Sequence, residues 1–269
     1  MATSFEAVYR DHYERLFTLA VRMTGNREDA EDVLQTSFLQ ALQAFPAFRN
    51  ECAVYTWLYR ILLNAARRYV KARRRLPIIA FAERLGMTED EAFAYVRGFG
   101  DSADAAVAAM VRESCLQMFM NCMPPRFRAV FTLRSILRFS SAETADILEI
   151  SENAVGVYLH RARRLAADHY GSRCSLVSPN GACSCRAFAS YRRAVGLPGL
   201  PEGIAAVVAA EEQAAEDYDR EIGTLMDLDR LYRTRFSPGD YGEFLERMRR
   251  LRTDGALRLL GAETAGPQA

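Results

Sequence analysis

Apolar residues in this chain recur at steps of three and four, and no stretch shows the steps of two that mark a β-strand. The first series begins with Phe5, Val8, Tyr9, His12 and Leu16. Such spacing puts apolar side chains on one face of a helix, and that face must pack against a partner. We therefore predict an all-α fold, with helices throughout residues 5–75 and again over 111–170.

Local signals mark where several helices begin and end. The stretch "TGNRED" at residues 24–29 predicts a turn and then a helix start, with Asn26 as the cap and acids in the first turn. That helix should continue to Pro46, and residues 48–52 should form a loop before the next helix.

Composition divides the chain into parts. Residues 76–110 mix proline, glycine and alanine and read as a linker with one short helix, and Gly171 marks a second break. Two more helical stretches follow, at about 203–235 and 240–260. At 269 residues the chain can hold two small helical domains, 5–76 and 111–170, joined by a linker (77–110) and followed by a mostly helical C-terminal extension (171–269).

Charge is distributed unevenly although the net charge is only +1. Seven basic residues lie in residues 53–75, and no acid occurs between Glu51 and Glu83. Residues 211–229 instead carry eight acids and the single Arg220. This asymmetry indicates one surface that faces a polyanion and one acidic surface that could compete for it. The sequence shows no signal peptide and no apolar run of membrane-spanning length, so we expect a cytoplasmic protein without membrane insertion.

Residues 53–75, "AVYTWLYRILLNAARRYVKARRR", combine aromatic and basic side chains. On a helix, one apolar stripe would face the core: Leu58, Ile61, Leu62, Ala65 and Tyr69. The residues outside that stripe should face solvent: Thr56, Arg60, Asn64, Arg67, Arg68 and Lys71. With Tyr55, Trp57 and Tyr59 nearby, this face suits single-stranded nucleic acid, because rings stack on bases and cations follow phosphates. The alternative is an amphipathic helix with a solvated basic face and a core tryptophan.

Residues 140–166, "SSAETADILEISENAVGVYLHRARRLA", have the pattern of a helix-turn-helix. Ser151 should cap the second helix, with Val155, Leu159 and Ala162 on its inner side. The outward face would then meet a DNA major groove. Its residues are Glu152, Asn153, Gly156, Val157, His160, Arg161 and Arg164. An ordinary helical hairpin is the alternative, but the basic end "HRARR" favours duplex DNA.

Three blocks together resemble a known family. "GNREDAEDVLQTSFLQAL", "AVYTWLYRILLNAARR" and "MPPRFRAVFTLRSILRFSSAETADILEISENAVGVYLHRAR" are similar to regions 2 and 4 of extracytoplasmic-function (group IV) sigma factors of bacterial RNA polymerase. The similarity covers about residues 5–170, in the family's order and spacing, and it is much vaguer over 171–269.

The resemblance implies a polymerase-binding helix. In the family, the helix that carries "DAEDVLQ" docks on the clamp coiled coil of the β′ subunit. The matching residues here are Asp29, Glu31, Asp32, Gln35, Phe38 and Leu39. Four acids within residues 28–32 suit a basic partner helix, although a solvated first turn that balances the helix dipole would look the same. Thr36 stands where the family usually has an acid.

The resemblance also implies two promoter contacts. Region 2 would hold the melted −10 element through Arg49, Asn50, Thr56, Trp57, Arg60, Asn64, Arg67, Arg68 and Lys71. Region 4 would read the −35 element through the outward face named above, and would contact the β flap. The recognition helix departs from the family, since Gly156, Val157 and Tyr158 stand where Lys or Arg is usual, and Glu149 replaces a glycine frequent in the turn. We therefore expect an unusual −35 element or weak dependence on it.

The cysteine cluster after residue 171 raises a separate question. Cys174, Cys183 and Cys185, with His169 upstream, form a candidate site for Zn²⁺ or another thiophilic metal such as Cu(I). A redox pair and simple unligated thiols are the alternatives, because the spacing lacks the paired C-x2-C form. Apart from this cluster, the sequence calls for no cofactor.

As a whole, the sequence predicts a sigma factor that binds core RNA polymerase and promoter DNA, directs −10 melting and transcription initiation, and is regulated through its C-terminal extension. An anti-sigma factor is a further candidate partner. The acidic stretch 211–229 could fold back on the DNA-facing surfaces, or could simply be a solvated helix. The rival function is a free-standing helix-turn-helix regulator that acts without polymerase. We expect no enzymatic activity, because we find no catalytic triad, phosphate loop or carboxylate pair in a convincing context.

Overall fold

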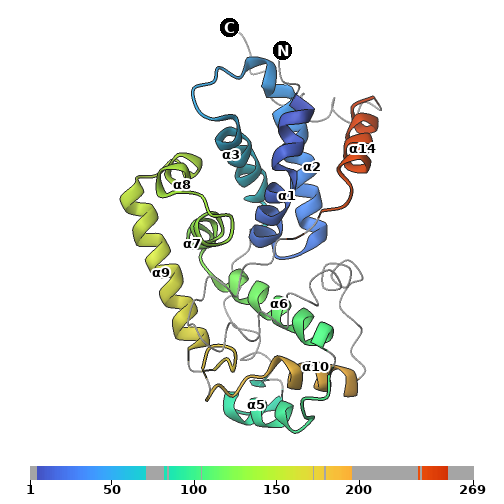
Figure 1. Ribbon diagram of the computed structural model, residues 1–269, viewed down its shortest axis with the longest axis vertical. Coiled ribbons are helices and arrows are strands. Elements are labelled where there is room, and N and C mark those ends of the chain that lie inside the picture. The colour runs from blue at the N-terminus through green and yellow to red at the C-terminus, as the bar shows by residue number, and fades with distance from the viewer. Residues whose placement is uncertain are drawn as a thin grey trace.

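The computed structural model describes residues 5–70, 82–83, 85–103, 105–171, 173–178, 180–195, 236 and 238–253. These residues form helices and connecting turns (Figure 1), and within the described ranges the one β-type pairing is an isolated bridge between Cys174 and Cys183. The predicted all-α fold is confirmed. None of the described helices combines the length and the apolar character needed to cross a membrane.

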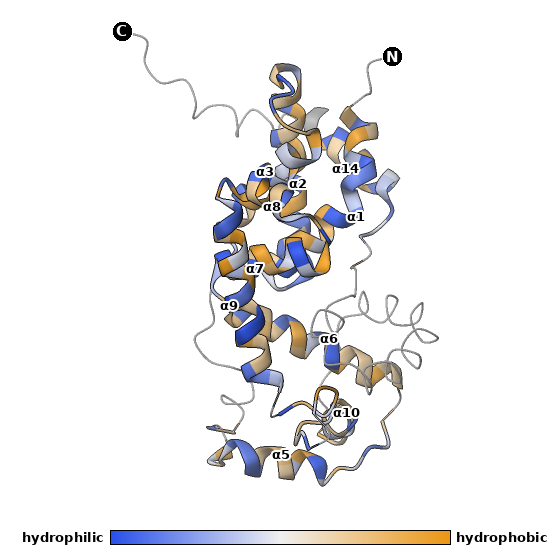
Figure 2. Cartoon of the chain, turned by 60° about the vertical axis from the view of Figure 1, so that its left-hand side comes forward, coloured by the Kyte–Doolittle hydropathy of each residue, from blue (hydrophilic) through white to orange (hydrophobic). Residues whose placement is uncertain are grey.

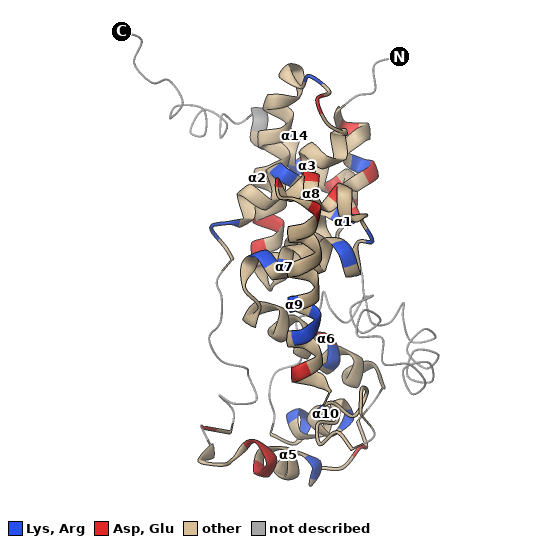
Figure 3. Ribbon diagram, turned by 90° about the vertical axis from the view of Figure 1, so that its left-hand side faces the viewer, with Lys and Arg blue, Asp and Glu red and all other residues tan. Residues whose placement is uncertain are grey.

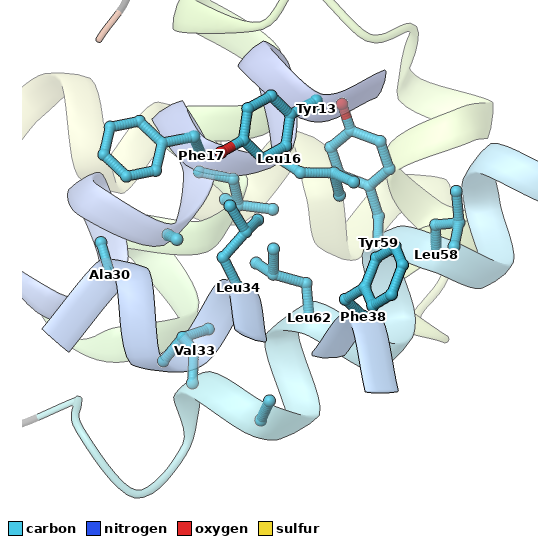
Figure 4. Close-up of a cluster of buried hydrophobic side chains, with 14 of the residues drawn as sticks. Tyr13, Leu16, Phe17, Ala30, Val33, Leu34, Phe38, Leu58, Tyr59 and Leu62 are labelled. Atoms are coloured by element: carbon cyan, nitrogen blue, oxygen red, sulfur yellow. The ribbon is translucent and has the colours of Figure 1, made fainter. Parts of the chain in front are cut away.

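The N-terminal part is a three-helix bundle of α1 (Phe5–Thr24), α2 (Arg27–Ala44) and α3 (Val54–Ala66). Its core is continuous across the three helices, as the side chains in Figure 4 show. The labelled residues at its centre include Leu16, Phe17, Leu34, Phe38 and Leu62. The apolar spacing predicted for these segments therefore corresponds to one shared core.

The turn between α1 and α2 follows its sequence signal. Asn26 caps α2, because its side-chain oxygen accepts a hydrogen bond from the backbone N–H of Asp29 at 2.8 Å. Gly25 has φ +98°, and a Cβ there would come within 2.5 Å of the Asn121 side chain. Glycine is therefore needed both for the backbone conformation and for the close approach of Asn121.

The second unit contains α7 (Pro125–Phe131), a π-helical turn (Thr132–Ile136), α8 (Ser141–Leu148) and α9 (Glu152–Tyr170). Ser140 and Glu143 form a capping box at the start of α8, and Ser151 caps α9 as predicted. Val130, Ala145 and Val155 form a small core where the three helices meet. The predicted helix-turn-helix is thus present as a packed pair of helices on α7.

The segment predicted as a linker is more helical than its composition indicates. It holds α5 (Glu89–Arg97) and the first turns of α6 (Ala105–Cys122). Alanine carries no apolar periodicity but is the strongest helix former, so periodicity gives no signal for the alanine-rich start of α6. The helix α10 (Cys185–Ala194) packs on both, with ring contacts Phe93–Phe188 (6.4 Å) and Tyr95–Tyr191 (6.0 Å). Parts of the linker and of the C-terminal extension therefore form a third helical unit (Figure 1).

Buried arginines join the units to one another. Arg22 of α1 is fully buried and pairs with Glu113 of α6, with 2.6 Å between Nη1 and Oε1. Arg128 of α7 is also fully buried and donates to the carbonyl of Met23 at 2.6 Å. Because charged groups are costly to bury without partners, these contacts fix α6 and α7 against the end of α1.

The last described helix, α14 (Tyr241–Thr253), lies along α1 and α2 on the side away from α3 (Figure 1). It confirms the second of the two helical stretches predicted for the extension. The first stretch, 203–235, and the acidic residues 211–229 within it lie outside the described residues.

Candidate nucleic-acid interface

The helix α3 carries the predicted apolar stripe. Leu58, Leu62 and Ala65 are buried in the core, while Ile61 is half-buried at its edge. Trp57 is half-buried and packs against two rings that precede α3, Phe48 (5.0 Å) and Phe45 (6.2 Å). The tryptophan therefore belongs to an aromatic cluster at the edge of the bundle, a position from which its face can also meet a ligand.

Most of the predicted −10 residues are accessible. Arg49 and Asn50, in the loop before α3, are exposed, and so are Asn64, Arg67 and Arg68 near its end. Lys71 lies outside the described residues.

The prediction that Thr56 faces solvent is wrong. Its exposed fraction is 2%. The helix is covered on a second side as well, since Tyr55 and Tyr59 pack against Phe139 in the loop before α8, with centroids 5.9 Å and 5.0 Å apart. Periodicity identifies the stripe that faces the bundle core, but it cannot identify this second contact.

Arg60 is engaged by α8. Its guanidinium donates to the backbone carbonyl of Asp146 at 2.7 Å and 3.0 Å, and its Nη1 lies 3.6 Å from a carboxylate oxygen of Glu149. The side chain is half-buried in this contact. A predicted DNA-contacting arginine is thus held by the helix-turn-helix unit.

Tyr55 makes a second contact between the two units. Its hydroxyl donates to the Glu143 carboxylate at 3.0 Å. Desolvation and this carboxylate raise the pKa of Tyr55, while the hydrogen bonds from Ser140 lower the pKa of Glu143. Both shifts keep the phenol protonated and the carboxylate charged at neutral pH, which is the arrangement that this hydrogen bond needs.

The outward face of α9 is open. All seven residues predicted to meet DNA are exposed, and Figure 3 shows basic residues along the middle of α9 and acidic residues on α8. Hydrophilic residues recur at successive turns of α9 (Figure 2). Tyr158 differs, because it is half-buried against Phe127 with 5.6 Å between centroids. The exposed, partly basic face of α9 is therefore accessible to a ligand such as a DNA major groove.

The turn of the helix-turn-helix has an unusual backbone. Glu149 ends α8 in the left-handed conformation, with φ 55° and ψ 47°. Glycine is the residue that adopts this conformation at least cost. The structure thus explains why a glycine is suited to this position, and it shows that the glutamate found here accepts the same conformation.

The predicted polymerase-binding residues of α2 are only partly accessible. Asp32 is exposed, and Asp29, Glu31 and Gln35 are half-buried. Glu31 pairs with Arg27 at 2.8 Å. Phe38 and Leu39 are buried, with 2% and 5% exposure, so in this arrangement they belong to the core instead of an open surface.

The cysteines do not form the predicted metal site. Cys174 and Cys183 are paired at the β-bridge, but the described residues contain no group of three or more His, Cys, Asp or Glu that could hold a metal ion. His169 instead stacks on Phe119, with 4.8 Å between the ring centroids and an angle of 5° between the ring planes. Burial raises the pKa of Cys174 and of Cys183, which keeps both thiols protonated.

Sequence reasoning missed Cys115 of α6 as a neighbour of this cluster. Burial raises its pKa to about 12, and Cys174 adds to the shift. Only the packing of α6 brings this thiol near, since almost sixty residues separate it from Cys174. The family resemblance carries no signal for it.

These features define a class of protein: an all-α DNA-binding protein that combines a helix-turn-helix with a separate aromatic and basic helix. Comparison with known families is more specific. Residues 8–76 match Sigma-70 region 2, and residues 113–165 match Sigma-70 region 4. Both matches are to regions of the sigma-70 family of RNA polymerase sigma factors, and several similar proteins are named as extracytoplasmic-function (ECF) sigma factors.

Individual relatives agree with this assignment. The chain is 32% identical over 172 residues to the ECF RNA polymerase sigma factor SigG of Mycobacterium tuberculosis, covering 59% of this chain and 46% of that protein. It is 28% identical over 167 residues to the RNA polymerase sigma-H factor of Pseudomonas aeruginosa, covering 60% and 82%. It is 29% identical over 135 residues to the ECF RNA polymerase sigma-E factor of Salmonella typhimurium, covering 50% and 70%. The chain spans less than half the length of the SigG protein.

Proposed function

We propose that this protein is a promoter-recognition subunit that binds core RNA polymerase, captures the melted −10 element and directs transcription initiation. The observation that carries the proposal is the order of its parts. An acidic helix, an aromatic and basic helix, and a helix-turn-helix with an exposed basic face follow one another in one chain. In this proposal, 5–76 is region 2, 77–110 the linker, 111–170 region 4 and 171–269 a regulatory extension.

The three surfaces have separate roles. The acidic start of α2 is proposed to meet the basic β′ clamp, with Asp29, Glu31, Asp32 and Gln35 as its accessible residues. The α3 side is proposed to hold the opened strand, where stacking contributes about 1–3 kcal/mol per base. The exposed members of that surface are Arg49, Asn50, Asn64, Arg67 and Arg68, and its half-buried members are Trp57 and Arg60. The outward face of α9 is proposed to read the −35 duplex, next to a contact with the β flap.

Binding of the opened strand requires the two units to separate. Arg60 cannot reach a phosphate while its guanidinium donates to the Asp146 carbonyl. We propose that polymerase holds region 2 and region 4 on separate surfaces, so that α8 leaves α3 and Arg60 is released. The described arrangement is then the closed form of the free protein.

The activity needs no cofactor and no catalytic group of this chain, because the polymerase supplies the chemistry. Its place of action is the cytoplasm, where the polymerase and the chromosome are. An anti-sigma factor is a candidate regulator besides the C-terminal extension.

A gel-shift experiment tests the proposal against its rival. A labelled promoter duplex is mixed with the purified protein, with and without core polymerase, and transcripts are mapped from a genomic library with the same components. We expect a specific complex and defined start sites only when polymerase is present. Specific binding of duplex DNA by the chain alone, with no effect of polymerase, would instead establish a free-standing helix-turn-helix regulator.

A further inference from the structure

The helix α14 is anchored on region 2 by two buried side chains. Phe244 is 3% exposed and Met248 is 1% exposed, and they lie one turn apart. The centroid of the Phe244 ring lies 4.9 Å from that of Tyr13 and 5.4 Å from that of Phe38. The Phe244 and Phe38 rings are perpendicular to each other. The apolar side of α14 therefore completes the core that α1 and α2 share.

Polar contacts fix the orientation of this segment. The Tyr241 hydroxyl donates to the carbonyl of Glu6 at 2.8 Å, and Arg249 pairs with the Glu6 carboxylate at 2.8 Å. Just before the helix, the backbone N–H of Phe236 donates to Thr18 Oγ1 at 3.2 Å. The Arg22 guanidinium lies 4.7 Å from the Phe236 ring centroid. Contacts of several kinds thus place the segment on one site of region 2.

This site overlaps the surface that α2 is proposed to offer to polymerase. Phe38, one of the predicted polymerase-binding residues, is buried and makes an edge-to-face ring contact with Phe244. Glu31, another of them, lines a cavity of about 380 Å³ together with Arg27 and Leu34. The C-terminal segment contributes further lining residues of the same cavity: Pro238, Gly239, Asp240, Glu243, Phe244 and Arg247. The segment thus stands over the same side of α2.

Charge points to the same conclusion. Residues 241–253 contain four arginines and two glutamates, whereas α2 begins with four acids in residues 28–32. A basic helix on an acidic helix is the electrostatic arrangement that the predicted clamp contact would also use. The helix α14 therefore offers α2 positive charge from within the same chain, as the basic polymerase clamp is proposed to do in the complex.

We propose that α14 occupies the polymerase-binding side of region 2 in the free protein and must be displaced when core polymerase binds. The inference rests on the proposed function. It differs from the hypothesis raised by the sequence, in which an acidic tail covers the DNA-facing surface, because α14 lies on the side of the bundle away from α3 (Figure 1). The extension then controls assembly with polymerase instead of contact with DNA. The apparent affinity for polymerase is lowered in proportion to the fraction of molecules in which α14 is docked.

The test compares two full-length variants with the natural chain. Phe244→Ala/Met248→Ala removes the two anchors, and Glu246→Ala/Arg250→Ala removes an ion pair on the exposed side of the same helix. We expect the first variant to bind core polymerase about tenfold more tightly, and the control to bind like the natural chain. Equal affinities for all three proteins would overturn the inference while leaving the proposed function intact. Failure of all three to bind polymerase would overturn both.

A second measurement does not depend on how well the first variant folds. Hydrogen exchange of the natural chain is followed over residues 241–253, with and without core polymerase. Displacement predicts that these amides exchange faster in the complex, while the amides of α1 stay protected. Retained protection of α14 in the complex would overturn the inference, whatever the affinities are.

Discussion

Arg60 of α3 and Glu149 at the end of α8 form an ion pair, with 3.6 Å between their charged atoms. The two residues belong to parts of the chain that are proposed to bind different promoter elements. Glu149 stands in a left-handed position where glycine would be easier, and its carboxylate meets an arginine of the proposed −10 surface. Glu149 therefore has a backbone conformation that is unusual for glutamate, and it also takes part in the contact that holds α8 against α3.

Two substitutions at position 149 separate the charge from the backbone. Glu149→Gln removes the ion pair but keeps a side chain in the left-handed position, and Glu149→Gly relieves that conformation as well. The pair is exposed on the Glu149 side, so we expect the glutamine variant to lose at most about 0.5 kcal/mol of unfolding free energy. The glycine variant should be more stable than the glutamine variant by about 0.5–1 kcal/mol. Urea unfolding measures both. If Glu149→Gln lowered the free energy of unfolding by more than about 1 kcal/mol, the ion pair would be stabilising the protein more than an exposed pair does.

The proposed −10 surface can be tested without disturbing that ion pair. Arg67 and Arg68 follow α3, are exposed and have no role in the core. In the complex with core polymerase, Arg67→Glu/Arg68→Glu should weaken binding of a −10 single strand about tenfold or more. The slope of log affinity against log salt should fall by about 0.7 for each phosphate that is no longer bound. Fluorescence anisotropy at several salt concentrations measures both. The matched control is Arg193→Glu, which reverses an exposed charge on the distant α10. Unchanged binding by the double variant would remove α3 as the strand-binding helix.

Local patterns in the sequence predict what depends on one helix and its core. Asn26 and Ser151 cap the helices that they are expected to cap, and Leu58, Leu62 and Val155 face inward as their spacing requires. These features depend on residues within a few positions of each other. Periodicity is a direct record of such constraints.

Contacts between units are not predictable in the same way. Tyr55 contacts Glu143, which lies 88 residues away in the sequence, and Phe244 contacts Phe38, which lies about two hundred residues away. A single amphipathic pattern predicts one buried face of a helix. The helix α3 is covered on a second side as well, and α2 is covered on a side that was expected to be exposed. Sequence spacing does not encode which distant helix covers a second face. The burial of Thr56 and the place of α14 therefore had to come from the structure.

The buried ion pair between α1 and α6 should be important for stability. Arg22 is completely buried, and Glu113 is its partner at 2.6 Å. Glu113→Ala would leave the guanidinium without its counter-charge, for which the expected cost is about 3–5 kcal/mol. The comparison is Asp168→Ala, which removes a pair that is exposed on α9 and should cost at most about 0.5 kcal/mol. Urea unfolding of the two variants decides the point. Similar stabilities would mean that Gln117, which accepts from Arg22 at 3.1 Å, suffices as a partner.

The recognition helix predicts an unusual −35 specificity. Gly156 and Val157 are exposed where a cationic side chain would reach a guanine, and Val157 has 41% of its surface exposed. We expect promoter profiling to show a weak or unfamiliar −35 motif, and a strict G-rich motif of the family type would contradict this. Val157→Arg should add about 1–3 kcal/mol of discrimination for a duplex with guanine at the facing position. Leu165→Arg adds the same charge two turns further along α9 and should strengthen binding without changing base preference.

Acid should loosen the packing of α9 on α6 through His169. Burial, with a smaller contribution from Arg173, lowers the pKa of His169 from 6.5 to about 4 while the ring is stacked on Phe119. Between pH 6.5 and about pH 4, His169 binds a proton more readily in the unfolded chain than in the folded one. The free energy of unfolding is therefore retained above pH 6.5 and falls as the pH approaches about 4. His169→Phe keeps a ring at this position and cannot titrate, so the decrease in stability between about pH 6.5 and 5 should become smaller. His12 adds a change of the same sign, because burial also lowers its pKa. Unfolding free energies measured at several pH values test this, and His160→Phe, on the exposed side of α9, is the matched control substitution. Identical pH profiles for His169→Phe and the natural chain would show that the buried imidazole does not limit stability in acid.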